Sequence, residues 1–472
     1  MRLSVLVDVL GPAVLDHVGG DPEVTSVTHD SRAVEPGGLF CCVPGERADG
    51  HDYTAAALAQ GAVALLVDRP LHLEPVDGVQ VAQVRVADVR RAMAPVAARF
   101  HGDPSRHLAV VGVTGTNGKT TVVHLLASAL RAGGLPAGQI GTLTGTRTTP
   151  EAPELHARLA AMRAEGNRAV AMEVSSHALT VHRVDGTWFE VAVFTNLSRD
   201  HLDFHPSMED YFEAKASLFT PDRCARAVVD VDDEWGRLLA ERLGAAGVVP
   251  TSTCSLASVH DLEVGIDDCR FGWRGQVVDV PLGGTHNAAN ALLAAEAAAA
   301  LGLDPAAIAR GIAEAGPLTG RFERVDGGQD FDVVVDYAHT PDALEKVLES
   351  VRAAASGRVL LVFGCGGDRD RSKRPEMGRV AAEGADVVVV TSDNPRSEAP
   401  EAIIEAVIAG IPESRRALVE PDRRAAIALL LEEAAPGDVV VVAGKGHETT
   451  QEVAGVHTPF DCLLYTSDAA DE

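Results

Sequence analysis

The feature that most constrains the fold of this chain is a glycine-rich loop at residues 113–121. An apolar run at 107–113 leads into the loop, and a helix-like segment at 122–130 follows it. A strand, a glycine-rich loop and a helix in this order form a P-loop, whose backbone N–H groups point at phosphate oxygens. The strict motif has a glycine where this chain has Val113, so the sequence predicts a variant P-loop.

The residue types in the loop indicate how it would hold a nucleotide. Glycine lets the backbone approach the phosphates closely. Lys119 supplies positive charge at the β- and γ-phosphates, and the hydroxyl of Thr120 can bind Mg²⁺. An ordinary glycine-rich turn would not need lysine and threonine side by side. We therefore expect a nucleotide site made of Gly115, Thr116, Asn117, Gly118, Lys119, Thr120 and Thr121.

Size and charge limit the classes of protein to which the chain can belong. Its 472 residues suffice for two to four domains. The formal net charge of −27 argues against a surface for nucleic acid or anionic membrane. No apolar run is long enough to cross a bilayer, and the first residues carry no secretory cleavage site. We expect a cytoplasmic protein, and we expect its seven scattered cysteines to be small buried residues.

Valine-rich runs alternate with helical segments along most of the chain. Such runs are typical of buried parallel strands in α/β proteins. They occur at 168–172, 191–194, 227–229, 332–335, 359–363, 385–390 and 438–443. The two sets indicate two doubly wound domains, separated by an alanine-rich helix at 287–300 and a hinge at 316–320. With a further α/β unit before the P-loop, we expect three α/β domains at 1–104, 105–319 and 320–472.

Polar side chains follow two of the predicted central strands. Glu173 ends one strand, at the edge where open α/β sheets bind ligands, and is a candidate metal ligand. The next strand leads to Asp200, His201, Asp203 and His205 within six residues. A zinc site or an ordinary polar loop would also explain this group. Beside a P-loop, we favour a second Mg²⁺ held by Glu173 and His201.

The last domain offers three charged turns after predicted strands. A glycine-rich segment at 363–374 is a second candidate anion site and contains Arg369. In the next turn, Arg396 could fork onto a carboxylate while Asp393 and Asn394 accept from an ammonium group; a plain Asx-Pro turn is the alternative. A third turn lies at 443–448. The pattern around Lys215, in contrast, is that of an ordinary exposed helix lysine.

The motifs together resemble those of the Mur ligase family, and more narrowly its members that add meso-diaminopimelate to UDP-N-acetylmuramoyl-L-alanyl-D-glutamate in peptidoglycan synthesis. The resemblance runs from about residue 30 to 461. Besides the P-loop, it rests on Asp-Ser-Arg (30–32), Thr-Thr-Pro (148–150), Met-Glu-Val-Ser-Ser-His (172–177), Asn-Leu-Ser-Arg-Asp-His (196–201), Asn-Ala-Ala-Asn (287–290), Gly-Arg (320–321), Asp-Tyr-Ala-His-Thr-Pro (336–341), Asp-Asn-Pro-Arg (393–396) and Gly-Lys-Gly-His-Glu (444–448).

The resemblance implies a fold, an activity and a set of cofactors. The fold would have a small N-terminal uridine-binding domain, a central P-loop ATPase domain with a parallel sheet, and a Rossmann-like C-terminal domain that brings the amino acid. The enzyme would be a monomer that uses ATP and Mg²⁺. Its partners would be the UDP-N-acetylmuramoyl dipeptide and meso-diaminopimelate, joined through an acyl phosphate.

The resemblance also assigns residues by motif. The uridine site would contain His29, Ser31, Glu46, Arg47 and Ala48, and the muramoyl dipeptide site Thr148, Thr149, Ser175 and Arg183. The adenosine part of ATP would be contacted by Asn290, Arg321 and Asp336, or these residues would help the C-terminal domain to close. The diaminopimelate site would contain Arg369, Asp393, Asn394, Pro395, Arg396, Gly444 and Glu448, with Arg396 gripping the extra carboxylate that lysine lacks.

For the metal sites, the resemblance implies Thr120, Glu173, His201 and Lys215. The local sequence pattern alone indicates an ordinary lysine at position 215, and the resemblance reverses that interpretation. In the family the matching lysine is carbamylated, and the carboxylate of the carbamate helps to hold the second Mg²⁺. Lys119, Glu173, His201 and Lys215 would then be the catalytic residues.

Two departures and three alternatives accompany this assignment. Val181 stands where the family often has glutamine, and residues 462–472 look foreign to the family, as if a native last helix had been replaced. Within the superfamily, a folylpolyglutamate synthetase or a ligase adding a D-alanyl dipeptide is possible, although the motifs at 30–32 and 393–396 weigh against both. In another class, a non-catalytic P-loop switch would leave Arg369 and Arg396 idle.

Overall fold

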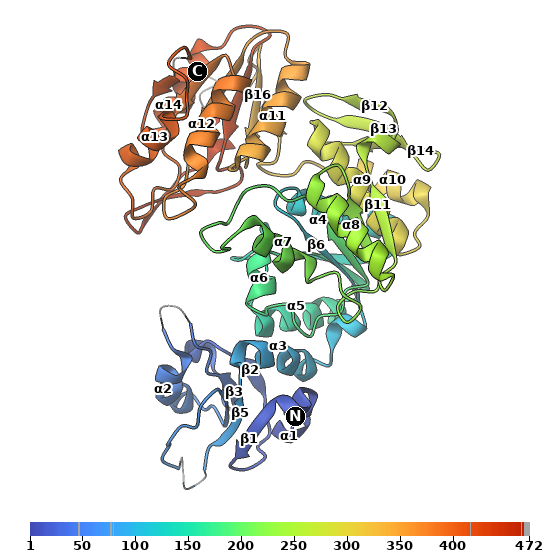
Figure 1. The fold of residues 1–472 in the computed structure, drawn as a ribbon, viewed down its shortest axis with the longest axis vertical. Helices are drawn as coiled ribbons and strands as arrows, with labels where there is room; N and C mark the ends of the chain where they lie inside the picture. The colour runs from blue at the N-terminus through green and yellow to red at the C-terminus, as the bar shows by residue number, and fades with distance from the viewer. Residues whose placement is uncertain (46–47, 76–77, 79, 416, 464, 467–472) are drawn as a thin grey trace.

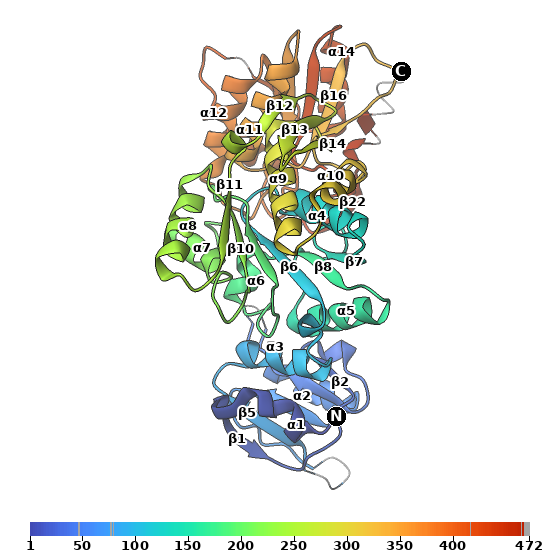
Figure 2. The same ribbon diagram turned by 90° about the vertical axis from the view of Figure 1, so that its right-hand side faces the viewer.

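The chain forms three α/β units stacked along one long axis, as Figures 1 and 2 show in a computed structural model. The structure describes residues 1–466 except 46–47, 76–77, 79, 416 and 464. The three-domain α/β prediction is confirmed, while the limits set at 104 and 319 stay predictions. None of the described helices combines the length and the apolar character that a membrane span needs.

The N-terminal unit is a five-stranded sheet with helices packed against it. Its strands lie in the order β1-β5-β4-β3-β2, and all neighbours are parallel except β1 and β5. The strands are β1 (Val14–Val18), β2 (Ser26–Thr28), β3 (Gly38–Cys41), β4 (Ala64–Val67) and β5 (Ala82–Val86), and the helices α1 (Leu3–Val7), α2 (Thr54–Ala59) and α3 (Val89–Phe100). Helix α3 packs against α5 and so joins this unit to the next.

The central unit is built on a six-stranded parallel sheet in the order β11-β10-β9-β6-β8-β7. Its strands are β6 (Ala109–Thr114), β7 (Ala137–Ile140), β8 (Ala169–Glu173), β9 (Val191–Phe194), β10 (Ala227–Asp230) and β11 (Thr251–Cys254). Its helices are α4 (Lys119–Ala132), α5 (Ala152–Ala164), α6 (Ser176–Thr180), α7 (Met208–Ala216), α8 (Glu234–Ala246), α9 (Thr285–Ala300) and α10 (Pro305–Ala313). Strand β6 lies in the middle, so the P-loop after it opens at the point where the strand order reverses.

A small antiparallel sheet in this unit was absent from the sequence predictions. It consists of β12 (His260–Val264), β13 (Cys269–Trp273) and β14 (Gln276–Val280). Phe271 and Val278 are buried in the core that α4, α9 and α10 share. The apolar residues of this sheet alternate with exposed ones, and so the segment lacks the continuous valine runs that marked the parallel strands.

The C-terminal unit has a six-stranded sheet in the order β15-β16-β20-β17-β18-β19, in which only the short β15 is antiparallel. Its strands are β15 (Glu323–Arg324), β16 (Asp332–Asp336), β17 (Val359–Phe363), β18 (Val387–Val390), β19 (Ala417–Val419) and β20 (Val439–Ala443), followed by the hairpin β21 (Thr450–Val453) and β22 (Val456–Pro459). Its helices are α11 (Pro341–Ala354), α12 (Lys373–Gly384), α13 (Pro400–Ile408) and α14 (Arg423–Glu433).

All seven cysteines are buried and free, as the sequence predicted. One of them, Cys462, packs with Phe460 on the core beneath α14. The foreign origin assigned to residues 462–472 stays a prediction, and positions 464 and 467–472 of that segment lie outside the described residues.

Candidate active site

The P-loop is fastened to the loop that follows β9. The backbone N–H of Thr116 donates to Asn196 O at 2.9 Å, and that of Asn117 donates to the Asn196 side chain at 3.0 Å. Thr195 Oγ1 donates to Asn117 O at 2.6 Å. Gly115 and Gly118 both have positive φ, and a Cβ on them would overlap the side chains of Thr195 and Asn290. Glycine is therefore required at both positions.

Lys119 folds back over the loop that it would use to bind phosphate. Its Nζ donates to Gly115 O at 3.0 Å and to Thr116 O at 2.8 Å. Desolvation lowers the pKa of Lys119. No carboxylate of the described residues forms an ion pair with this amine. Its charge is thus held at the loop without an acidic partner, as a phosphate-binding cation requires.

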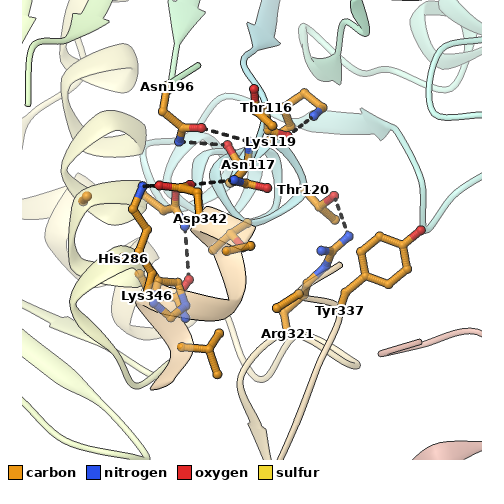
Figure 3. A pocket seen from close by; sticks show the side chains of 18 of the residues that line it. Thr116, Asn117, Lys119, Thr120, Asn196, His286, Arg321, Tyr337, Asp342 and Lys346 are labelled. Carbon is orange, nitrogen blue, oxygen red and sulfur yellow. Dashed lines mark hydrogen bonds and ion pairs between the residues drawn. The ribbon is translucent and has the colours of Figure 1, made fainter. Parts of the chain in front are cut away.

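A cavity of about 690 Å³ opens in front of the P-loop, a size that suits a nucleotide. The residues expected at the adenosine all line it, namely Asn290, Arg321 and Asp336. Arg321 reaches from the C-terminal unit, lies against the Tyr337 ring and donates to Thr120 Oγ1 at 3.4 Å (Figure 3). The structure thus brings these predicted residues together with the P-loop.

Helix α11 of the C-terminal unit forms another wall of the cavity, which the sequence analysis missed. Asn117 Nδ2 donates to Asp342 Oδ2 at 2.9 Å, and Lys346 Nζ lies 3.0 Å from the same carboxyl group (Figure 3). Opposite, Asp230 ends β10, and burial raises its pKa to about 7. Asp230 could have been found by the rule that selected Glu173, because both are carboxylates at strand ends.

Glu173 and His201 reach the same cavity as Thr120. Glu173 is 2% exposed and accepts from the Thr142 backbone N–H at 2.8 Å. Desolvation lowers the pKa of His201 despite the opposing charge of Asp200, so its ring is neutral. A carboxylate, a hydroxyl and a neutral imidazole are donors that Mg²⁺ accepts beside phosphate oxygens.

No compact group of three His, Cys, Asp or Glu side chains suited to a metal occurs within the described part of the chain. The zinc alternative for the loop at 200–205 therefore loses its support. His205 Nε2 instead lies 2.9 Å from Ser176 Oγ, and Asp203 is exposed.

The pattern-based interpretation of Lys215 as an exposed lysine is wrong. The residue is 1% exposed, and its Nζ donates to Gly115 O at 2.7 Å beneath the P-loop. Burial and the nearby charge of Lys119 lower its pKa well below the usual value. Among the described residues, no carboxylate pairs with it. A neutral buried amine is the form that reacts with CO₂, so this position suits a carbamate.

The described residues expected at the precursor come from the first two units. Ser31 begins a short 3₁₀ turn and His29 is half-buried just before it; Ala48 is exposed, while Glu46 and Arg47 lie outside the described residues. On the central unit, Thr149 Oγ1 accepts from Ser175 N at 3.0 Å and Arg183 Nη1 donates to Thr149 O at 3.3 Å. Thr148 Oγ1 lies 3.0 Å from Thr142 Oγ1, close to Glu173.

Three of the polar residues expected at the amino acid, Asp393, Asn394 and Glu448, form one network at the strand ends of the C-terminal unit. Asn394 Nδ2 donates to Glu448 Oε2 at 2.8 Å, and the buried Lys445 donates to both side chains. Gly444 packs against Asp393, where a Cβ would approach the carboxylate to 2.9 Å. Lys445, which the sequence analysis did not single out, ties these residues together. Such a network is more than a plain Asx-Pro turn requires.

Arg396 holds the two loops of this site together. Its Nη1 donates to Gly367 O at 2.7 Å, and its Nε lies 3.5 Å from Glu452 Oε2. Its backbone has φ of 52°, a conformation that costs a non-glycine residue about 1–3 kcal/mol and often marks a functional position. Pro395 packs on Gly367, and Arg369 is exposed nearby.

Polar contacts beside this network hold the C-terminal unit against the central one. Asp200 is 6% exposed, and it lies 3.5 Å from Lys373 Nζ and 3.7 Å from His339 Nε2. Burial alone would raise the pKa of Asp200, but the polar contact with His339 and the charge of Lys373 lower it well below the usual value. Arg199 donates to Ser372 Oγ at 2.5 Å. The segment that fastens the P-loop therefore also contacts the loop after Arg369.

Three family models match the chain in sequence order. They are described as "Mur ligase family, catalytic domain" over residues 23–101, "Mur ligase middle domain" over 113–298 and "Mur ligase, glutamate ligase domain" over 320–446. Among curated relatives, the UDP-N-acetylmuramoyl-L-alanyl-D-glutamate–2,6-diaminopimelate ligase of Streptomyces coelicolor is 47% identical and is matched over 97% of this chain and 94% of its own length. The ligase of that name from Gloeobacter violaceus is 47% identical over 93% and 92%.

Solved structures agree with the sequence comparison. A structure of a UDP-N-acetylmuramoyl-L-alanyl-D-glutamate–2,6-diaminopimelate ligase superposes with a TM-score of 0.66 at 35% identity, over 95% of each chain. MurF from Acinetobacter baumannii has a TM-score of 0.68 at 20% identity over 99% and 98% of the two chains, which shows a shared fold alone. By identity along nearly its whole length, this chain belongs to the Mur ligase family.

Proposed function

We propose that this protein is an ATP-dependent amide ligase that adds meso-diaminopimelate to UDP-N-acetylmuramoyl-L-alanyl-D-glutamate in peptidoglycan synthesis. The observation that carries the proposal is one arrangement: a P-loop cavity on the central unit and a polar network around Arg396 on the unit held against it. Curated relatives named for this reaction are 47% identical over nearly the whole chain.

The reaction would proceed in two bond-forming steps. The D-glutamyl carboxylate attacks the γ-phosphorus of ATP, so that a C–O–P bond forms and ADP leaves. The diaminopimelate amine then attacks the acyl carbon, the tetrahedral intermediate collapses, and the C–N bond forms as inorganic phosphate leaves and the amine loses a proton. Phosphorylation is needed because a carboxylate is a poor acyl donor.

Residues around the P-loop would supply the electrostatics of the first step. Lys119 would move from the carbonyls of Gly115 and Thr116 to the β- and γ-phosphates. Thr120, Glu173, His201 and carbamylated Lys215 would hold Mg²⁺. When bound, Mg²⁺ neutralises charge on the transferring phosphoryl group. Asn290, Arg321 and Asp336 would orient the rest of the nucleotide.

The incoming amino acid would be held by the network around Arg396. The guanidinium group can grip the second carboxylate of diaminopimelate in a forked contact, and Asp393, Asn394 and Glu448 offer acceptors to an ammonium group. The polar contacts at Asp200 would keep this site aligned with the P-loop. Because L-lysine lacks that carboxylate, it would bind more weakly.

Location and assembly follow from the chemistry as further parts of the proposal. The substrates are ATP and a UDP-linked precursor, so we expect the enzyme to work in the cytoplasm. We also expect a monomer.

A component-omission assay tests the proposal against a P-loop switch. We expect phosphate release and amide formation only when ATP, the UDP-linked precursor and diaminopimelate are all present. One phosphate should be released for each amide formed. Steady ATP hydrolysis that ignores the precursor and the amino acid would instead indicate a switch. Phosphate can be followed by a coupled colour assay and the amide by mass spectrometry.

A further inference from the structure

Three arginines converge on one buried carboxylate at the junction of the first two units. Glu151 is 4% exposed. Its oxygens lie 2.8 Å from Arg183 Nη2, 3.3 Å from Arg147 Nη1 and 3.4 Å from Arg90 Nη1. One carboxylate cannot neutralise three guanidinium groups, so positive charge remains at this point of a chain whose net charge is −27. A local excess of this kind attracts an anionic ligand.

The neighbouring acidic group does not compensate the excess. Asp30 is already engaged by Arg32, whose Nη2 lies 2.7 Å from Asp30 Oδ2. Burial lowers the pKa of His29, Glu151 raises it in part, and Arg147 and Arg90 lower it further, so the His29 ring is neutral. His29 of the N-terminal unit therefore lies near Arg90 and Arg147.

The three arginines come from three different segments that the fold brings together. Arg90 lies in the first turn of α3, Arg147 just before α5, and Arg183 just after α6. Helix α3 lies along α5 in both views (Figures 1 and 2). The side chains differ in exposure: Arg183 is 19% exposed, Arg90 29% and Arg147 52%. Arg90 and Arg147 thus keep donors free to meet a ligand, while Arg183 is the more buried.

We propose that Arg90 and Arg147 bind the diphosphate of the UDP-linked precursor. This inference rests on the proposed function, in which His29 contacts the uridine and Arg183 the muramoyl dipeptide. In the precursor, the diphosphate lies between these two parts, and Arg90 and Arg147 lie near enough to both His29 and Arg183 to lower the pKa of each. The flat guanidinium fork matches phosphate oxygens, and two forks from opposite units can hold two phosphates.

Glu151 has a defined role in this arrangement. It holds the buried Arg183 by the shortest of the three contacts and keeps Arg147 and Arg90 poised at longer ones. When a diphosphate arrives, Arg147 can turn to it at little cost because half of its side chain is already in solvent. Because Arg90 belongs to the N-terminal unit, the same contact fixes the orientation of that unit on the central one.

The test compares UDP with uridine as competitors of the precursor. Charge-assisted hydrogen bonds to phosphate are worth about 1.5–3 kcal/mol each, which corresponds to at least about a tenfold change. We expect Arg147→Ala to raise the inhibition constant of UDP by about tenfold or more and that of uridine by less than about twofold. Arg90→Gln should act in the same direction, and Arg147→Lys should retain part of the UDP affinity.

Arg99→Ala is the matched control, because Arg99 lies on α3 but pairs with Asp103 on the exposed surface. Its UDP affinity should equal that of the wild type. Melting temperature and ATP affinity should stay unchanged in Arg147→Ala. The inference would be overturned if Arg147→Ala weakened the binding of UDP and uridine equally or left UDP binding unchanged. It would also be overturned if the wild type bound UDP no more tightly than uridine. Failure of the proposed function would show differently, as wild-type protein that discriminates UDP from uridine but forms no amide.

Discussion

Replacing Lys119 with alanine is expected to reduce ATP-dependent amide formation by about 10³-fold or more, the range found for cations that stabilise phosphoryl transfer. The reason is geometric. Its Nζ sits at the mouth of the P-loop, 2.8 Å from Thr116 O, without any acidic partner among the described residues. The other lysine of the cavity, Lys346, is already paired with Asp342, and Lys215 lies buried beneath the loop. Single-turnover phosphate release with all substrates present measures the loss.

Arg131→Ala is the matched control for this variant, because Arg131 lies in the last turn of the same helix and faces away from the cavity. It should turn over like the wild type. Near-normal phosphate release by Lys119→Ala, with a melting temperature equal to that of the wild type, would remove the P-loop from the mechanism.

Lys215→Met is expected to lower turnover by about 100-fold or more while the protein stays folded. Methionine fills the space of the buried side chain and removes an amine whose burial as a cation is unfavourable, so the free energy of unfolding should not fall. The loss arises because the side chain can no longer become a carbamate that holds Mg²⁺. Steady-state rates and the Mg²⁺ concentration for half-maximal rate measure it.

Carbamylation itself has separate readouts. Because CO₂ reacts only with the neutral amine and burial lowers the pKa of Lys215, activity of the wild type should fall when CO₂ and bicarbonate are removed and return when they are restored. Added short carboxylic acids should partly restore the activity of Lys215→Met. The control variant Glu213→Gln, on the exposed face of the same helix, should be fully active without them. Full activity of Lys215→Met would contradict the carbamate role.

The parallel sheets and the nucleotide site were predictable because their signals are local. Each predicted valine run became a strand, since a strand buried on both faces needs apolar residues at every position. The P-loop needed only the nine consecutive residues 113–121. Glu173 followed from the rule that ligands bind at the carboxyl ends of parallel strands.

Features that depend on tertiary packing left no such signal. Lys215 sits in an ordinary helical pattern, and only the placement of α7 under the P-loop buries it. Asp342 and Lys346 have the i, i+4 spacing of an exposed ion pair, yet α11 carries them to the cavity of another unit. The arginines at Glu151 are spread over more than ninety residues and meet only through α3 and α5.

The measurement that tests the central claim most directly is phosphate release with the UDP-linked precursor and ATP, supplied with either meso-diaminopimelate or L-lysine. Arg396 is joined to the polar network through Glu452, so we expect release with diaminopimelate and little with lysine. Arg396→Ala should lose most of the diaminopimelate rate and the preference with it. Equal release with lysine would contradict the assigned substrate, and release with neither amino acid would contradict the ligase assignment itself.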